Sequence, residues 1–186
     1  MRAGVLRYCP ICDGFERSGA NLAVLGSNLH RAAEALFLHQ FSKRVSLIPH
    51  AAVALTASQL AELTASDMPV IERRVSTIRH LSDTIAIQLD GEAAARRFDI
   101  LCPALGAVPA HRACPQLGIE AEPDGGLTAA ALAEPLVLGL FAAGNVLSGL
   151  DQISVAAGQG ATAATRLHNW LRAQQRHILS AEPIAD

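Results

Sequence analysis

Short apolar runs alternate with amphipathic stretches along the first part of the chain. Residues 21–26 and 45–48 are apolar, and their lengths and the Gly and Pro residues that bound them are typical of buried parallel strands. Between these runs, apolar residues recur at helical spacing over residues 29–40. This strand–helix–strand order predicts a parallel unit of the kind found in nucleotide-binding α/β folds.

The stretch that follows predicts one more helix and a set of antiparallel strands. A Ser or Thr cap favours a helix over residues 56–63. Residues 70–78 and 84–91 have the character of strands, and the second alternates apolar with polar side chains before an Asp-Gly pair, as hairpin strands do. Residues 97–102 indicate a further strand. We therefore expect an antiparallel flap beside the parallel sheet.

The remaining residues predict a second, smaller part. Residues 103–126 are rich in Pro and Gly and indicate loop, residues 139–144 form an apolar run that predicts a strand, and residues 153–171 predict a helix with small residues four apart. The fold class is thus α/β, with a Rossmann-like nucleotide-binding domain, an antiparallel flap and a partial second domain. The expected boundaries are 1–103, 104–172 and a tail at 173–186.

Composition narrows the classes of function. The chain has 186 residues, 51% of them apolar, and a net charge of −2, which gives no reason to expect nucleic acid or an anionic membrane as partner. No apolar run reaches the length of a membrane span, and Arg7 interrupts the start of the chain before a signal-peptide core could form. Four cysteines are too few for a disulfide scaffold in a chain of this length, so we expect a cytoplasmic redox protein.

The strongest chemical signal is a Cys-x-x-Cys-Asp sequence at Cys9, Cys12 and Asp13. Two thiols at this spacing close into a small disulfide that is readily reduced, and a neighbouring carboxylate can take or give the proton that exchange moves. Two alternatives remain open. The pair could be half of a zinc site, although no second ligand pair follows, or it could be two buried thiols that act as small apolar residues.

The loop after the first strand departs from the dinucleotide-binding pattern. Gly26 occupies the first glycine position, but Asn28 and Arg31 occupy the second and third. His30 or Arg31 could assist in binding an anion at this helix start, but a solvated helix face is the favoured interpretation for both. After Ile48 there is neither an acid for the ribose of NAD nor an arginine for the 2′-phosphate of NADP. Gly26 is therefore only a weak candidate for cofactor binding.

Two separated motifs resemble one known family. Residues 9–16, Cys-Pro-Ile-Cys-Asp-Gly-Phe-Glu, are similar to the redox motif of the low-molecular-weight thioredoxin reductases and their relatives. Residues 141–146, followed by residues 152–161, resemble the second flavin motif of the same family, in the same order and at the same spacing. The resemblance covers about residues 5–172.

The resemblance implies a flavin-linked thiol–disulfide oxidoreductase that uses FAD. Cys12 would face the flavin, Cys9 would exchange with an outside disulfide, and Asp13 would be the acid/base. The expected flavin contacts are Gly144 and Asn145 at the ribitol or pyrophosphate, and Gln152 and Ile153 at the isoalloxazine ring.

Three departures from the family change what the resemblance implies. Asn145 stands where the family has Asp. The basic pair that reads NADPH is missing, which puts NADPH in doubt. The expected alternatives are that another reductant, such as ferredoxin, supplies the electrons, or that the chain oxidises substrate dithiols. The family's N-terminal flavin-binding half has no counterpart among the eight residues before Cys9. We therefore expect an uncovered apolar strand edge in residues 104–171, and a partner chain or a second copy that covers it.

The substrate implied by the resemblance is a thioredoxin-like protein or a small disulfide. The alternatives are a split-gene subunit, or a non-catalytic fragment or remnant that acts as a binding or assembly module.

Overall fold

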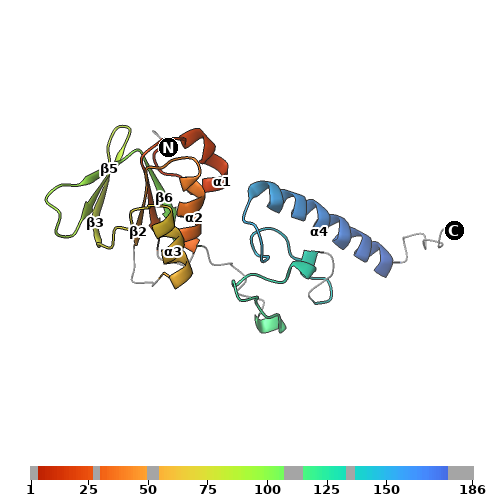
Figure 1. Ribbon diagram of the computed structural model, residues 1–186. Coiled ribbons are helices and arrows are strands. Elements are labelled where there is room, and N and C mark those ends of the chain that lie inside the picture. Colours follow the sequence, from red (N-terminus) through yellow and green to blue (C-terminus); the bar gives the residue numbers. More distant parts are fainter. Residues whose placement is uncertain (1–3, 27–29, 50–54, 107–114, 133–136, 176–186) are drawn as a thin grey trace. The chain divides into compact units, whose positions relative to one another are not determined.

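The computed structural model describes residues 4–26, 30–49, 55–106, 115–132 and 137–175 (Figure 1). The chain divides into two compact units, Met1–Gly106 and Ala107–Asp186. Each unit is described by itself below.

A three-stranded parallel sheet forms the centre of the first unit. Its strands are β1 (Leu22–Gly26), β2 (Val45–Pro49) and β6 (Ile100–Ala104), in the order β2-β1-β6. Every residue of β1 is buried, because the strand lies between two neighbours and is covered on both faces. The parallel unit expected from the apolar runs is confirmed.

Helices cover one face of this sheet (Figure 1). They are α2 (His30–His39) and α3 (Ala57–Ala65), while the short α1 (Pro10–Asp13) packs beside α2 and buries no residue of its own. A capping box starts α3, because the Thr56 hydroxyl accepts from the Gln59 amide and the Gln59 side chain accepts from the Thr56 amide. The helices predicted at 29–40 and 56–63 are confirmed, although residues 27–29, which precede α2, lie outside the described residues. Alternate strand residues point to this face, among them Leu22, Val24, Val45, Leu47, Ile100 and Cys102.

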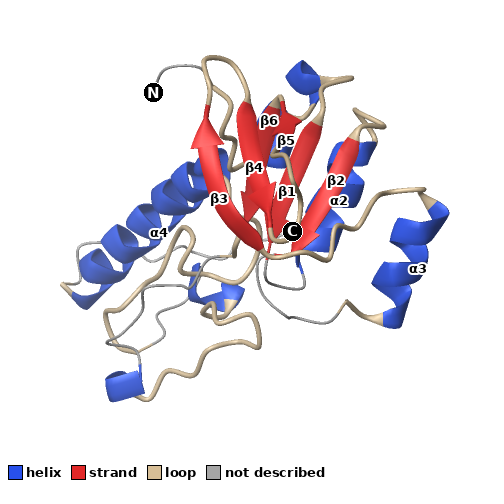
Figure 2. Cartoon of the chain, turned by 90° about the vertical axis from the view of Figure 1, so that its left-hand side faces the viewer, coloured by secondary structure: helices blue, strands red, loops and turns tan. Residues whose placement is uncertain are grey.

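An antiparallel sheet covers the opposite face, and Figure 2 shows its strands in front of the parallel sheet. It consists of β3 (Val75–His80), β4 (Ile85–Leu89) and β5 (Arg96–Phe98), and β3 carries an irregularity between Val75 and Thr77. Its buried residues share a core with the other side chains of the parallel strands; they are Ile85, Ile87, Leu89 and Phe98, packed with Ala23, Leu25, Ile48 and Leu101.

Two details of this flap differ from the sequence prediction. The single strand expected at 97–102 is two strands, because the chain turns at Asp99, whose carboxylate accepts from the Asn21 amide at 2.7 Å. The strand expected at 70–78 begins at Val75, because Val70 instead forms an isolated parallel bridge with Leu47. Both differences come from long-range pairing with the parallel sheet.

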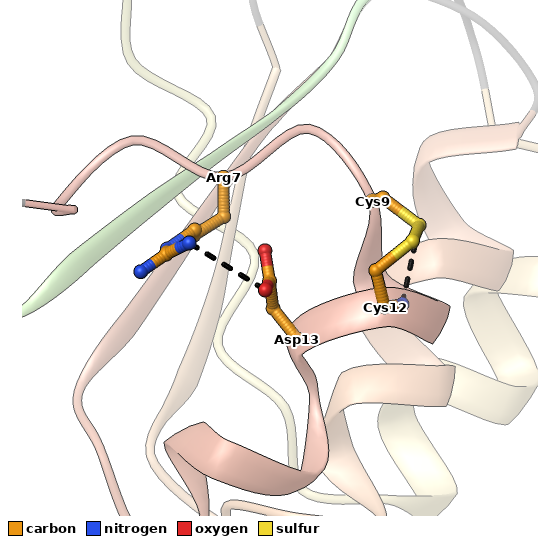
Figure 3. The surroundings of a disulfide bond; sticks show 4 residues. All are labelled: Arg7, Cys9, Cys12 and Asp13. Atoms are coloured by element: carbon orange, nitrogen blue, oxygen red, sulfur yellow. Dashed lines mark hydrogen bonds and ion pairs between the residues drawn. A yellow bond between two sulfur atoms is a disulfide. The ribbon is translucent and has the colours of Figure 1, made fainter. Parts of the chain in front are cut away.

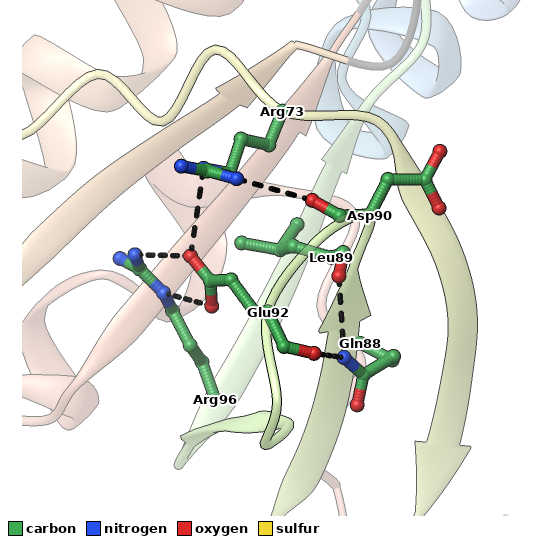
Figure 4. A network of polar contacts seen from close by, with 6 residues as sticks. All are labelled: Arg73, Gln88, Leu89, Asp90, Glu92 and Arg96. Carbon is green, nitrogen blue, oxygen red and sulfur yellow. Dashed lines mark hydrogen bonds and ion pairs between the residues drawn. The ribbon is translucent and has the colours of Figure 1, made fainter.

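A polar network closes the turn between β4 and β5 (Figure 4). The Glu92 carboxylate accepts from Arg96 at 2.6 and 2.9 Å and lies 3.9 Å from the Arg73 guanidinium. The hydrogen bond from Arg96 lowers the pKa of Glu92. The Gln88 side chain donates to the Glu92 carbonyl oxygen at 2.7 Å, so side chains from both sides of the turn hold it in one conformation.

The second unit is built around one long helix and several loops. α4 (Ile153–Gln174) confirms the helix predicted at 153–171 and extends three residues beyond it, so the tail expected from residue 173 begins within the helix; residues 176–186 lie outside the described part. Only Ala163 is buried among its side chains. None of the helices in the described residues is long and apolar enough to cross a membrane.

The strand predicted at residues 139–144 is wrong. These residues form only an isolated bridge between Val137 and Leu140, and both Gly139 and Gly144 adopt positive φ, of 84° and 79°, which ends an extended run. The expected uncovered strand edge is therefore absent from this segment. From this segment, Ala142 instead packs in a small cluster with Leu127 and Leu147.

Candidate redox site

Cys9 and Cys12 form a disulfide at the start of α1 (Figure 3). Their Cα atoms are 5.3 Å apart, because Pro10 begins a single helical turn that brings the two residues together. The Cys12 amide donates to the Cys9 sulfur at 3.1 Å. Cys12 is exposed and Cys9 is partly exposed, so the interpretation of two inert buried thiols is wrong.

The disulfide also bears on the zinc alternative. Both sulfurs are engaged in the S–S bond, whereas a zinc ligand must be a free thiolate. Within the described ranges, no group of three or more His, Cys, Asp or Glu side chains is arranged to hold a metal ion.

Asp13 ends the same helical turn, and its carboxylate points toward Arg7 in Figure 3. The Arg7 Nη1 atom lies 3.5 Å from Asp13 Oδ1, and the two side chains are 29% and 31% exposed. An ion pair this close to solvent contributes at most about 1 kcal/mol to stability. Its main consequence is therefore geometric, since it determines where the carboxylate lies beside the disulfide turn.

Three large apolar side chains that are close in sequence to the cysteine pair are exposed at the surface. Tyr8, Ile11 and Phe15 are 67%, 56% and 76% exposed. Below them Gly14 is buried, and a Cβ atom there would meet the Pro10 carbonyl oxygen at 2.6 Å and the Phe41 ring at 3.0 Å. The turn can pack this closely only with glycine after Asp13.

Cys102 lies on β6 and is 3% exposed. Burial, followed by the negative charges of Glu34 and Asp13, raises the pKa of the Cys102 thiol to about 12, and Arg7 opposes the shift. The thiol is therefore protonated at neutral pH and does not compete in exchange, because only thiolates attack disulfides. Cys114 lies outside the described residues.

The second predicted motif forms a turn against α4. The Gly144 amide donates to the Gln159 side chain at 2.8 Å, and a Cβ atom on Gly144 would lie 3.6 Å from the Ala156 Cβ. Asn145 and Ile153 are exposed, and no side chain caps the start of α4 at Gln152. The hydrogen bond between Gly144 and Gln159 thus joins the two parts of the second motif, residues 141–146 and 152–161.

Gly26, the weak candidate for cofactor binding, is less suited to that role. A Cβ atom on Gly26 would come 2.4 Å from the Arg31 Cβ and 2.8 Å from the Ala104 carbonyl oxygen, so this glycine serves close packing of α2 and β6 on β1. Arg31 is 2% exposed, so the expectation of a solvated helix face is wrong for this residue. The side chain of His30 lies outside the described residues, as do residues 27–29 and 50–54.

No protein-family model matches the chain. It is 26% identical over 181 residues to the thioredoxin reductase of Bacillus subtilis (strain 168), and the match covers 92% of this chain and 57% of that protein. Among solved structures, HlmI is 29% identical with a TM-score of 0.80, and the match covers 92% of this chain and 54% of HlmI. The chain is therefore similar to thioredoxin reductase-like pyridine nucleotide-disulfide oxidoreductases, over little more than half of their length.

Other structures support the fold of this thioredoxin reductase-like chain. The atypical thioredoxin reductase TRi from Desulfovibrio vulgaris Hildenborough is 25% identical with a TM-score of 0.53, over 94% of this chain and 62% of TRi. The thioredoxin reductase from Streptococcus pyogenes MGAS5005 is 23% identical with a TM-score of 0.77, which shows the fold alone. The chain spans 57% of the length of the curated relative that it matches.

Within this thioredoxin reductase-like chain, the site residues fall into two groups. Cys9, Cys12 and Asp13 share one helical turn of the first unit, whereas the expected flavin contacts lie at the start of α4 in the second. Sequence reasoning missed Arg7 as part of the site. The only signal in the sequence was a cation two residues before Cys9, and its contact with Asp13 depends on the folded turn.

Proposed function

We propose that the chain carries the redox-active disulfide of a flavin-linked thiol–disulfide oxidoreductase, in which electrons pass between FAD and the Cys9–Cys12 pair. The substrate would be a disulfide of a thioredoxin-like protein or of a small molecule. The observation that carries the proposal is the closed disulfide on a surface helical turn that ends in Asp13.

The two sulfurs suit different roles. The Cys12 amide that donates to the Cys9 sulfur would stabilise a thiolate at Cys9 after reduction, which favours Cys9 as the residue that attacks the substrate disulfide. Cys12 would then attack the Cys9 sulfur in the mixed disulfide, which releases the substrate as a thiol and restores the Cys9–Cys12 bond. Asp13 would move the proton that the leaving sulfur takes up.

The residues of the second unit fit part of a flavin. Gly144, Asn145 and the start of α4 would hold its polar chain, and the exposed Ile153 would lie against its ring, with Gln152 beside it. Bound FAD would supply or accept the electron pair of the disulfide.

NADPH does not fit the described residues. The space at Gly26 is filled by Arg31 and Ala104, and β2 ends in Ile48 and Pro49 without an acid or an arginine. The chain would therefore exchange electrons with another reductant, such as ferredoxin, or with substrate dithiols.

Several large apolar side chains of the second unit are exposed, which is in line with assembly with a partner chain or a second copy. Leu138, Leu150 and Ile153 are 85%, 57% and 91% exposed, and α4 buries only Ala163. Such side chains favour contact with another protein surface. A purified chain that is monomeric, monodisperse and cooperatively unfolding would contradict this assembly.

The test of the proposed function is the visible absorbance of the purified chain, alone and after titration with FAD. We expect flavin absorbance that bleaches when a dithiol is added without oxygen. Cys12→Ser should abolish the bleaching, whereas Cys102→Ala, which changes a buried thiol outside the exchange, should leave it intact.

A Cys12→Ser variant with unchanged disulfide turnover would refute the assigned role. A chain that binds no flavin, and whose disulfide does not exchange with glutathione, would instead support a non-catalytic assembly module.

A further inference from the structure

The backbone of Arg7 is held by the parallel sheet and not by the disulfide turn. Its amide donates to the Leu101 carbonyl oxygen at 3.0 Å, the Leu101 amide donates to the Val5 carbonyl oxygen at 2.8 Å, and Leu6 forms a parallel bridge with Leu101. Residues 5–7 thus extend the sheet beyond β6. The backbone of Arg7 is therefore held by hydrogen bonds that involve neither Cys9 nor Cys12.

The side chain of Arg7 is held at a second point. Its Nε atom donates to the Gly4 carbonyl oxygen at 2.8 Å. Gly4 has a φ of +45°, which favours glycine, and a Cβ atom there would lie 2.6 Å from Arg7 Nη2, so the guanidinium lies directly over this residue. With Nε engaged, the other end of the guanidinium is directed to Asp13, at 3.5 Å.

Asp13 belongs to the turn that carries both sulfurs. Its amide donates to the Cys9 carbonyl oxygen at 3.3 Å, and the next residue, Gly14, donates to Pro10 at 2.8 Å. Backbone bonds thus hold the main chain of Asp13, while its carboxylate has rotational freedom that the contact with Arg7 restricts. In Figure 3 the carboxylate lies between Arg7 and the disulfide.

We propose that Arg7 is a positioning residue for thiol–disulfide exchange, which holds the Asp13 carboxyl group where it serves the Cys9–Cys12 pair. The inference rests on the proposed function of that pair. In the step concerned, an external thiolate attacks the Cys9 sulfur, the Cys9–Cys12 bond breaks, and its electron pair remains on the Cys12 sulfur, which receives a proton by way of Asp13. A second external thiol then resolves the mixed disulfide, so that two thiols are oxidised to a disulfide while the protein pair is reduced.

The test is a double-mutant cycle on the full chain that needs no flavin. The rate of reduction of the protein disulfide by dithiothreitol is measured from pH 5 to pH 9, by alkylation at timed intervals and mass spectrometry, and is corrected for the thiolate fraction of the reagent. The proteins are the unchanged chain, Arg7→Gln, Asp13→Asn, the double variant and Arg7→Lys. Arg79→Gln, which removes an exposed arginine on β3, is the matched control.

We expect Asp13→Asn to slow reduction on the order of 100-fold, as loss of a proton-transfer group does. Arg7→Gln should slow reduction about tenfold, and it should alter the dependence of the reduction rate on pH in the same way as Asp13→Asn does. The double variant should be no slower than Asp13→Asn alone, because Arg7 acts only through that carboxylate. Arg7→Lys retains a cation, so on a logarithmic scale its reduction rate should fall by about half as much as that of Arg7→Gln.

Other outcomes separate the inference from the proposed function. If Arg7→Gln slows reduction by the same factor with Asp13 present or absent, Arg7 does not act through Asp13 and the inference is wrong. If Asp13→Asn itself has no effect, the role assigned to Asp13 in the proposed function fails instead, and the inference fails with it. If Arg7→Gln does not fold, Arg7→Lys is compared with the unchanged chain and, in a further double variant, with Asp13→Asn; equal factors of slowing in the two pairs overturn the inference.

Discussion

Stability at alkaline pH is a direct test of the environment of Cys102. The perturbation is Cys102→Ala, which removes the only ionisable group that projects from β6 into the helix-covered core. Burial raises the pKa of this thiol from its ordinary value of 9.0 to about 12 in the folded chain. Between these values the unfolded chain loses the proton while the folded chain keeps it, so the folded state binds one more proton and stability falls as the pH rises.

The magnitude follows from the shift. Each pH unit within this window costs about 1.4 kcal/mol in the free energy of unfolding. From pH 7 to pH 10.5 the contribution of Cys102 therefore amounts to a loss of about 2 kcal/mol. Below pH 8 the group contributes no slope, because the thiol is protonated in both states.

The assay is urea unfolding followed by circular dichroism at several pH values between 7 and 10.5. Both the unchanged chain and Cys102→Ala would carry Cys114→Ser, so that Cys102 is the one cysteine outside the Cys9–Cys12 pair in which the two proteins differ. Cys102→Ala should be less stable at pH 7 by about 1 kcal/mol because a buried sulfur is lost, and this difference should vanish or reverse by pH 10.5. Parallel stability curves for the two proteins would refute the reasoning, since they would mean that Cys102 ionises equally in the folded and unfolded chain.

Three further outcomes follow from packing and exposure. Gly26→Ala should destabilise the first unit by about 1–3 kcal/mol in urea unfolding, because the new methyl group has no space. Gly158→Ala in α4 should instead raise stability by about 0.5–1 kcal/mol, because a Cβ atom there meets nothing within 4 Å. Leu47→Ala should cost about 2–5 kcal/mol, since Leu47 is fully buried at the centre of the helix-covered core, and an unchanged unfolding midpoint would contradict that placement. In peptide-resolved alkylation after mild reduction, the two disulfide cysteines should react in the native chain, while modification of Cys102 should require denaturation.

The local pattern of the sequence was sufficient to predict most helices and strands of the first unit. The apolar runs of β1 and β2, the spacing of α2 and the cap of α3 depend on residues that are close in sequence, and all were predicted with small errors at their ends. The spacing of Cys9 and Cys12 likewise predicts their disulfide, because one helical turn brings the two residues together. The same reasoning failed at residues 139–144, where apolar character indicated a strand that has no partner strands in the described chain.

The sequence by itself determined the order of strands and helices in the first unit and the pairing of Cys9 with Cys12, because periodicity, caps and short turns are local properties. Only the tertiary structure decided that Arg7 meets Asp13, that Arg31 is buried against Gly26 and that Cys102 is sealed beneath the helices. Cys102 reaches this position because β6 returns from residue 100 to lie beside β1, and β6 also supplies the Leu101 carbonyl oxygen that holds Arg7 and the Ala104 carbonyl oxygen that closes the space over Gly26. No pattern within a short window of the sequence carries that information.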